Sequence, residues 1–323
     1  MRDTEASGEF VFFDFEPEQG NMAAEVLSGL AQTPKVISPK YFYDSRGSEL
    51  FERITELEEY YVTRTEMALF DSYLGELAEL TGRDVCVIEY GSGSSMKIRK
   101  LLEALTPRAY VPIDISLEHL RANAWALHQD YPSLDVYPIC ADLTQPFELP
   151  KETDGLAKVG FSPGSSIGNF EPREARQFLQ TVHTTLGVGA NLIIGVDRKK
   201  SRSVLEAAYN DQQGVTAEFN LNLLTHLNNK LGANFIVDQF SHDARYNEEL
   251  GCIQMFLKSH CSQQVEVLGE SFQFGKNEEL HTENSYKYDP HELSELALGA
   301  GFQVSAQWSD EQDWFSLYLL TAV

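Results

Sequence analysis

The strongest constraint on the fold is a regular alternation of two kinds of segment between residues 85 and 197. Short apolar runs predict strands at 85–91, 109–116 and 134–143, a fourth that starts at 158, and a fifth at 190–197. Between them, apolar residues recur at helical spacing, which predicts helices at 96–105, 117–131 and 172–186. Repeated strand–helix units of this length are typical of a parallel, doubly wound α/β sheet.

The end of the chain adds a helix and two strands to this pattern. Residues 289–302 have a helical pattern that stops at a glycine, and residues 302–310 and 314–323 predict an antiparallel pair. A doubly wound sheet that finishes with a strand hairpin resembles the class I methyltransferases, whereas a dinucleotide-binding Rossmann domain normally ends differently. We therefore expect a class I methyltransferase sheet at 65–197 and 289–323.

The remaining residues, 1–64 and 198–288, predict a second domain. Residues 204–232 are largely helical, and 252–260, 264–274 and 284–288 have the composition of strands. A segment of this length is too long to be a loop. We expect an inserted α+β domain that binds the substrate as a lid, joined in space by the N-terminal segment.

Composition narrows the functional classes. Asp and Glu total 49 against 25 Lys and Arg, a net charge of −24 that repels phosphate backbones and disfavours nucleic acid as a partner. No apolar run approaches the ~18 residues that span a membrane, and the acidic N-terminus does not resemble a signal peptide. We expect a cytoplasmic monomer without a membrane partner. The four cysteines lack CxxC spacing and the eight histidines are scattered, so no metal site is predicted.

The turn after the first predicted strand, "EYGSGSS" at 89–95, is the first candidate binding site. It lies at the carboxyl end of a strand, where doubly wound folds bind ligands. Gly91 and Gly93 lack the side chains that would block close approach of a ligand to the backbone. Ser94, Ser95 and Met96 follow, so the third glycine of G-x-G-x-x-G is missing at position 96, which disfavours NAD.

Acidic residues end the first three predicted strands. Asp114 follows the second strand, where a carboxylate can accept both hydroxyls of a ribose, and Asp142 follows the third, where methyltransferases often bind the adenine amino group. Together with Glu89, Gly91 and Gly93 they favour S-adenosylmethionine (SAM) as the cofactor. NAD or another nucleotide remains an alternative, as do ordinary strand–helix turns with polar ends.

Four stretches outside this general pattern resemble the histidine Nα-methyltransferases of ergothioneine biosynthesis. They are "PKYFYDSRGSELFERITELEEYYVTRTE" (39–66), "GSSIGNF" (164–170), "YNDQQGVTAEFNLNLL" (209–224) and "HTENSYKY" (281–288). The resemblance covers nearly the whole chain from Pro34. It implies a class I methyltransferase domain with a family-specific substrate domain. The implied activity is the SAM-dependent transfer of three methyl groups to the α-amine of L-histidine, which gives hercynine.

The resemblance also implies roles for individual residues. The cofactor site would include Gly91, Lys97, Asp114, Asp142 and Leu143. Asn169 and Tyr209 would bind the substrate carboxylate, and Gly164 would lie near the amine. With Tyr43, which we expect to orient the amine, Asn169 and Tyr209 form the expected catalytic set.

A second implied set lines the substrate pocket: Tyr43, Phe51, Tyr60, Met255, Glu283 and Ser285. Family members that act on histidine bind its imidazole with a Glu and a Ser. One departure is the turn "GSSIGN", where a Gly-Thr-type turn is expected; Ser166 keeps the hydroxyl of that threonine. The departure leaves fine substrate preference less determined.

The chemistry of imidazole independently favours the pair at 283 and 285. Glu283 can accept from the ring N–H, while Ser285 can donate to the other ring nitrogen. Residues two apart point to the same face of a strand. A bound tryptophan or phenylalanine would leave these polar groups unpaired, at roughly 1–3 kcal/mol each.

Other functions stay open on the sequence alone. The chain could methylate another amino acid, such as a tryptophan derivative, or it could be a catalytically silent SAM-binding partner subunit. An NAD oxidoreductase is a third alternative, disfavoured by the missing glycine. Taken singly, Met255 fits core packing, Glu283 fits a surface acid and Lys97 fits a solvated helix start.

Overall fold

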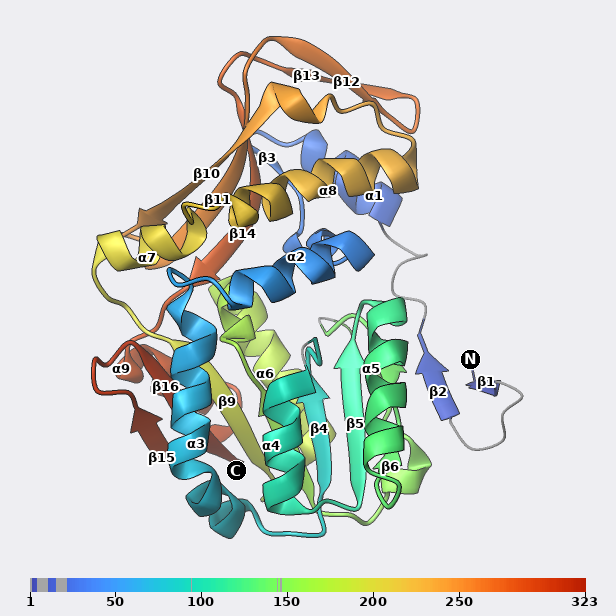
Figure 1. Cartoon of the computed structure of the whole chain (residues 1–323), viewed down its shortest axis with the longest axis vertical. Helices are drawn as coiled ribbons and strands as arrows, with labels where there is room; N and C mark the ends of the chain where they lie inside the picture. The colour runs from blue at the N-terminus through green and yellow to red at the C-terminus, as the bar shows by residue number, and fades with distance from the viewer. Residues whose placement is uncertain (1, 5–10, 16–21, 94, 144, 146) are drawn as a thin grey trace. The chain divides into compact units, whose positions relative to one another are not determined.

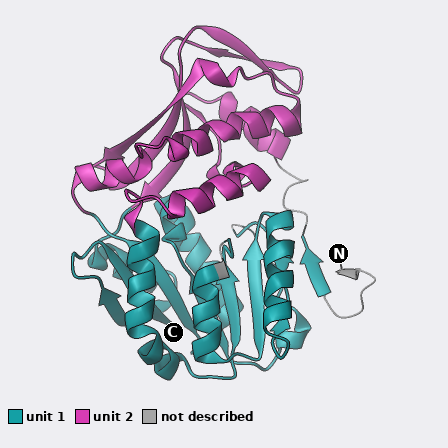
Figure 2. Ribbon diagram, in the orientation of Figure 1, with its two compact units in different colours: residues 1–17, 62–199, 287–323 teal, residues 18–61, 200–286 magenta. Residues whose placement is uncertain are grey.

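The computed structural model describes residues 2–4, 11–15, 22–93, 95–143, 145 and 147–323. The chain forms two compact units, coloured separately in Figure 2. Unit 1 comprises Met1–Pro17, Val62–Lys199 and Lys287–Val323, and unit 2 comprises Glu18–Tyr61 and Lys200–Tyr286. No helix among the described residues is long and apolar enough to cross a membrane.

Unit 1 is built on one large sheet with the order β1-β2-β7-β5-β4-β8-β9-β16-β15, in which β6 also pairs with β5. The strands are β1 (Arg2–Thr4), β2 (Val11–Asp14), β4 (Cys86–Tyr90), β5 (Ala109–Asp114), β6 (Asp135–Val136), β7 (Ile139–Cys140), β8 (Lys158–Ser162), β9 (Asn191–Asp197), β15 (Phe302–Ser309) and β16 (Phe315–Ala322). The strands from β7 to β9 run parallel, and β16 lies antiparallel between β9 and β15. This order, with its C-terminal hairpin, confirms the predicted class I methyltransferase fold.

Helices cover both faces of this sheet, as Figure 1 shows. The helices α3 (Tyr61–Thr81), α4 (Ser95–Leu105) and α5 (Leu117–Asp130) lie on the near face, and α6 (Pro172–Leu186) and α9 (Pro290–Leu298) lie on the far face. Both α6 and α9 begin with a proline, whose fixed φ suits the first turn, and with a capping box that satisfies free N–H groups. The central strands are buried along almost their whole length, which explains their continuous apolar runs.

Two expectations about unit 1 were wrong in detail. The strand predicted at 134–143 is two short strands, β6 and β7, because Pro138 between them has no N–H to donate to the ladder. The N-terminal strands do not belong with the substrate domain predicted for 1–64. Phe13 pairs with Ile139, and Phe12 packs on Leu120, which places β2 in the large sheet between β1 and β7.

Unit 2 contains a smaller sheet with the order β10-β11-β14-β3 and a separate hairpin, β12–β13. Its strands are β3 (Lys35–Val36), β10 (Phe240–Asn247), β11 (Cys252–Ser259), β12 (Gln263–Val267), β13 (Glu270–Phe274) and β14 (Glu279–Tyr286). The helices are α1 (Met22–Leu30), α2 (Ser45–Thr55), α7 (Arg202–Tyr209) and α8 (Val215–Leu231), with short 3₁₀ turns at η1 (Pro39–Phe42) and η4 (Val237–Gln239). The expected α+β composition of 198–288 is therefore present, although β14 begins five residues before the strand expected at 284–288.

The start of α2 is held by a polar cap. Asp44 accepts a hydrogen bond from the Gly47 N–H at 2.7 Å and another from the Asn222 amide at 2.8 Å. A Cβ at Gly47 would lie 1.7 Å from the Phe42 carbonyl oxygen, so a side chain at this position is excluded. The cap therefore fixes the chain direction immediately after Tyr43, one of the predicted site residues.

A buried ion pair joins two segments of unit 1. Lys287 Nζ lies 2.8 Å from Asp197 Oδ2, and both side chains are almost completely buried. The Tyr288 N–H donates to the Asp197 carbonyl at 3.1 Å, so a main-chain hydrogen bond joins the same two segments. The pair ties the end of β9 to the start of the C-terminal segment.

We expect Lys287→Met to lower the free energy of unfolding by roughly 3–5 kcal/mol, because it removes a buried cation that is paired with the Asp197 carboxylate. The double variant D197N/K287M should recover part of this loss, since it leaves no buried charge. Chemical denaturation of the full chain measures both. A single variant as stable as the unsubstituted protein would contradict the prediction.

Candidate active site

The glycine turn at the end of β4 is fixed to the neighbouring strand. Gly91 has a φ of +82°, in the left-handed region that favours glycine. The N–H groups of Gly91 and Ser92 both donate to the Ile113 carbonyl, at 2.9 and 3.0 Å. Apart from its chain neighbours, an added Cβ at Gly91 or Gly93 would have no atom of the described residues within 4 Å, so the side of the turn where side chains would project is open.

The other end of the turn is held from α5. The Gly93 carbonyl accepts from Asn123 Nδ2 at 2.7 Å and from His119 Nε2 at 2.9 Å. Because a carbonyl can only accept, Nε2 of His119 carries a proton. Ser94, which follows in the sequence, lies outside the described residues. The backbone from Gly91 to Gly93 is thus anchored at both ends.

Glu89 is a buried carboxyl group beneath this turn. Its side chain accepts a hydrogen bond from the Tyr110 hydroxyl. Burial raises the pKa of Glu89 to about 8, although the Tyr110 hydrogen bond and the nearby Lys97 ammonium act in the opposite direction. A cation bound close by would favour its ionised form.

The predicted acids lie at the ends of adjacent strands. Asp114, the last residue of β5, pairs in register with Cys140 of β7, and Asp142 follows two residues later. Asp114 Oδ1 accepts from the Ser116 N–H at 2.9 Å, and burial raises the pKa of Asp114. Leu143 follows Asp142 and is half-buried. Gly91, Asp114 and Asp142 therefore gather at one edge of the sheet, as parallel pairing requires.

These residues fit a nucleoside cofactor that carries a positive charge. The glycine turn offers open space beside anchored backbone, and two strand-end carboxylates can accept from hydroxyl or amino groups. The buried Glu89 supplies a group whose ionisation a nearby cation would stabilise.

A second turn in unit 1 follows β8 and contains Gly164 and Asn169. Gly164 and Ser165 have φ values of +74° and +60°, and the chain then forms a 3₁₀ turn, η3 (Ser166–Asn169). Ser165 Oγ accepts from the Asp197 N–H at 2.9 Å, which fixes the turn to the end of β9. Among the described residues, the half-buried Asn169 amide has no hydrogen-bond partner. It is available to a ligand.

The sequence analysis missed Glu66, which connects two of the predicted residues. This carboxylate forms an ion pair with Lys97 and accepts from the Gly164 N–H at 2.9 and 3.0 Å. Its position as the last residue of the stretch at 39–66 was the one signal that could have drawn attention to it.

In unit 2, the predicted pair at 283 and 285 lies on β14. Glu283 pairs with Met255 and Ser285 with Ile253, so both predicted side chains point to the same face of the strand. Both are buried. A bulge between Met255 and Phe256 leaves Thr282 as the extra residue, and such bulges re-aim neighbouring side chains.

Tyr209, at the end of α7, contacts the same strand. Its hydroxyl lies 2.8 Å from Ser285 Oγ in a buried hydrogen bond in which either group can donate. The Tyr209 carbonyl accepts from His242 Nε2 at 2.8 Å, which fixes the end of the helix to β10. Tyr209 is therefore held at both its main chain and its hydroxyl.

His242 is a further residue that the sequence did not single out. The Asn220 Nδ2 group faces both the Phe256 carbonyl, at 3.1 Å, and His242 Nδ1, at 2.9 Å. Because a carbonyl can only accept, the atom facing Phe256 must be the NH₂ group, so Nδ1 accepts and Nε2 carries the proton. Burial lowers the pKa of His242, which agrees with this neutral tautomer.

The predicted aromatic residues of unit 2 form a chain of ring contacts. Tyr43 and Phe51 lie 5.8 Å apart, Phe51 and Tyr60 6.4 Å, and Tyr60 and Tyr209 6.2 Å, each pair edge to face. Phe219 of α8, which the sequence analysis missed, contacts both Tyr43 and Phe51. Such edge-to-face contacts hold the rings in defined orientations.

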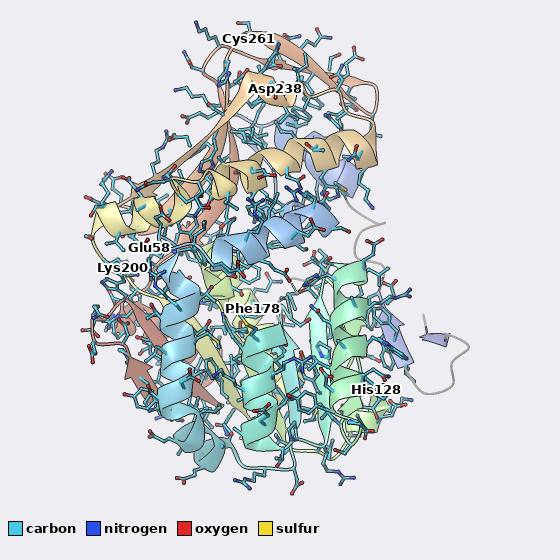
Figure 3. The ribbon with its side chains drawn as sticks, in the orientation of Figure 1. Glu58, His128, Phe178, Lys200, Asp238 and Cys261 are labelled. Atoms are coloured by element: carbon cyan, nitrogen blue, oxygen red, sulfur yellow. The ribbon has the colours of Figure 1, made fainter. Side chains whose placement is uncertain are left out.

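The structure thus sorts the predicted residues into two groups. Unit 1 holds Glu89, Gly91, Gly93, Lys97, Asp114, Asp142, Leu143, Gly164 and Asn169. Unit 2 holds Tyr43, Phe51, Tyr60, Tyr209, Met255, Glu283 and Ser285. Figure 3 labels Phe178 of α6, which stacks on Phe170 directly after Asn169, and Lys200, whose Nζ donates to the Tyr61 hydroxyl at 2.6 Å.

Curated relatives were found among both bacterial and fungal enzymes. A histidine N-alpha-methyltransferase of Mycobacterium tuberculosis is 38% identical over 91% of this chain and 93% of its own length. Ergothioneine biosynthesis protein 1 of Neurospora crassa is 30% identical over 89% of this chain and 33% of its own length. A 4-dimethylallyltryptophan N-methyltransferase of Claviceps purpurea is 24% identical over 94% of this chain and 95% of its own length.

A family profile matches almost the whole described chain. It covers residues 22–322 and is described as "Histidine-specific methyltransferase, SAM-dependent". The match includes both units, from α1 to the last strand of the C-terminal hairpin. The chain belongs to the histidine-specific, SAM-dependent methyltransferases.

Proposed function

We propose that this chain transfers three methyl groups in succession to the α-amine of L-histidine and so makes hercynine for ergothioneine biosynthesis. One observation carries the proposal: a buried carboxylate, Glu283, and a buried hydroxyl, Ser285, share one face of β14. The names of the mycobacterial and Neurospora relatives agree with it.

Glu283 and Ser285 match the hydrogen-bonding pattern of a neutral imidazole ring. In our proposal, Glu283 accepts from the ring N–H and Ser285 donates to the other nitrogen. Met255, directly across from Glu283 on β11, supplies apolar contact beside the ring. An indole or phenyl ring does not offer Glu283 and Ser285 the one donor and one acceptor of an imidazole, which disfavours the tryptophan-derived alternative.

The hydrogen bond between the Tyr209 and Ser285 hydroxyls determines which proton each can donate to the substrate. One proton lies between them, so a Tyr209 hydroxyl that donates to Ser285 leaves the Ser285 proton for the imidazole nitrogen. When Tyr209 instead donates its proton to the substrate carboxylate, it no longer donates to Ser285, and the single Ser285 proton still goes to the imidazole nitrogen. We propose that Tyr209 and Asn169 bind this carboxylate, which fixes the orientation of the amine throughout the successive transfers.

On the cofactor side, we propose that Glu89, Gly91, Gly93, Lys97, Asp114, Asp142 and Leu143 hold SAM. The bound cofactor supplies an electrophilic methyl group. The protein therefore needs to orient a neutral amine rather than activate a strong nucleophile. Tyr43 orients the amine in our proposal, near Gly164, and the proton of the amine leaves through water. A trimethylated amine has no lone pair to accept a fourth methyl group, so the series of transfers stops there.

The same proposal includes a monomer in the cytoplasm with a small-molecule substrate. The net charge of −24 supports solubility and disfavours nucleic acid. A silent SAM-binding subunit is disfavoured, because the Asn169 amide, which has no hydrogen-bond partner among the described residues, would then have no substrate to bind.

Incubation of the full chain with SAM and each of the twenty amino acids tests the function. We expect histidine alone to gain the mass of three methyl groups. Glu283→Ala should raise the KM for histidine about 10- to 100-fold, since one buried hydrogen bond to the ring is lost, and leave the KM for SAM unchanged. Glu279→Ala, on the same strand but paired with Arg245, is the matched control. Methylation of a different amino acid would contradict the proposal.

Glu89 predicts a pH dependence of stability. Its pKa of about 8 in the folded chain lies above the ~4.3 of an unfolded chain, so folding binds a proton between these values. The free energy of unfolding should fall through this range by at most about 1.4 kcal/mol per pH unit, and this contribution should level off above the folded pKa.

Denaturation of the full chain without cofactor, from acid pH to above the folded pKa, measures this slope. Glu89→Gln should match the parent protein at acid pH and become progressively more stable than it as the pH rises, because the amide has no charge to bury. Parallel stability curves for the two proteins would refute the assignment.

A further inference from the structure

The side chain of Glu66 is placed where two proposed ligand-binding residues meet. It extends from α3 and is fully buried, and each of its oxygens is within hydrogen-bond distance of the Gly164 N–H. One of them also forms the ion pair with Lys97, whose side chain is 13% exposed. A Cβ built on Gly164 would lie 3.6 Å from Lys97 Nζ, so the three groups converge on one point.

A glycine in β9, Gly195, leaves room for the Glu66 side chain. A Cβ at Gly195, in the middle of β9, would lie 2.0 Å from Glu66 Oε1 and 2.9 Å from a carbon of Phe315. Glycine weakens the interior of a strand, and its presence there often marks a close approach by another group. The close approach here is the carboxylate of Glu66. Gly195 therefore belongs to the same arrangement.

Burial determines which role Glu66 can have. A fully buried carboxylate is costly unless it is paired and hydrogen-bonded, and Glu66 meets both conditions through Lys97 and Gly164. With no exposed surface, it does not reach a ligand or accept a proton from the substrate amine. Its action on a ligand must pass through the two groups that it holds.

We propose that Glu66 is a positioning residue that sets the place of the Lys97 ammonium and the Gly164 amide, so that cofactor affinity depends on a carboxylate that does not touch the cofactor. This inference rests on the proposed roles of Lys97 and Gly164. It deepens the proposed function, because one side chain, Glu66, links Lys97 of the cofactor site to Gly164, which is assigned near the substrate amine. Lys97 enters the site already paired with a carboxylate, which leaves it a directed donor with little net charge.

Binding of S-adenosylhomocysteine to the full chain, measured by calorimetry, tests the proposal without requiring methylation. Glu66→Gln should weaken binding by about 10- to 100-fold, because the amide has no negative charge to pair with Lys97 and only one acceptor oxygen for the two donors. Lys97→Met should weaken binding comparably, and the double variant should be no weaker than K97M, since residues of one network act together. Glu79→Gln, an exposed acid on the same helix, is the matched control and should bind as the parent protein does.

Two results would overturn the proposal: E66Q binding within twofold of the parent protein at an unchanged melting temperature, or additive losses in the double variant. The binding measurement separates this inference from the proposed function. A parent protein that binds S-adenosylhomocysteine but does not methylate histidine would contradict the proposed function and leave this inference standing.

A second measurement covers a Glu66→Gln protein that does not fold. In the parent protein labelled with ¹⁵N-glycine, the Gly164 amide should resist hydrogen exchange, and in K97M its resonance should shift, because the same carboxylate holds both groups. A Gly164 amide that exchanges freely, or whose resonance is unchanged in K97M, would contradict the proposal.

Discussion

Parallel pairing from β7 to β9 is the constraint on which the cofactor side of the molecule depends. Parallel strands place their carboxyl ends at one edge of the sheet, so residues far apart in the sequence gather there: Gly91, Asp114, Asp142 and Gly164. Within the sheet, neighbouring strands also pair one another's backbone N–H and C=O groups. The turns after the strands are therefore the parts that can bind a ligand. The glycine turn is hydrogen-bonded to β5 and α5, which fixes the position of its open side.

Buried acids recur in both units, and in unit 1 they are bonded to particular partners. In unit 1, Glu89 is bonded to Tyr110 and Glu66 to Lys97 and Gly164. In unit 2, Glu283 lies across from Met255. Since an isolated buried carboxylate is expensive, such groups persist where pairing or a ligand offsets the cost. In unit 1, α3 brings the Glu66 side chain to the large sheet, and in unit 2, α7 brings the Tyr209 hydroxyl to β14.

The sequence predicted the elements whose signal is local, and missed those that depend on distant pairing. Buried parallel strands are continuous apolar runs, so the class I methyltransferase sheet and its hairpin were predictable. The place of β2 depends on which strand lies alongside, whereas the split between β6 and β7 had a local signal in Pro138 that the prediction did not use. The contact between Gly164 and Glu66 joins residues 98 apart, and no spacing rule indicates it.

The candidate site divides in the same way. The glycine turn and strand-end acids follow from general fold rules, whereas the substrate residues came from resemblance. The neutral tautomer of His242, which fixes the Tyr209 main chain, required the Asn220 geometry. The most direct test of the account is NMR of the product made from histidine and SAM labelled with ¹³C in the methyl group. The account predicts one labelled methyl resonance that correlates with the α-carbon, from a trimethylated amine. Label on an imidazole nitrogen, or a final product with fewer methyl groups, would contradict it.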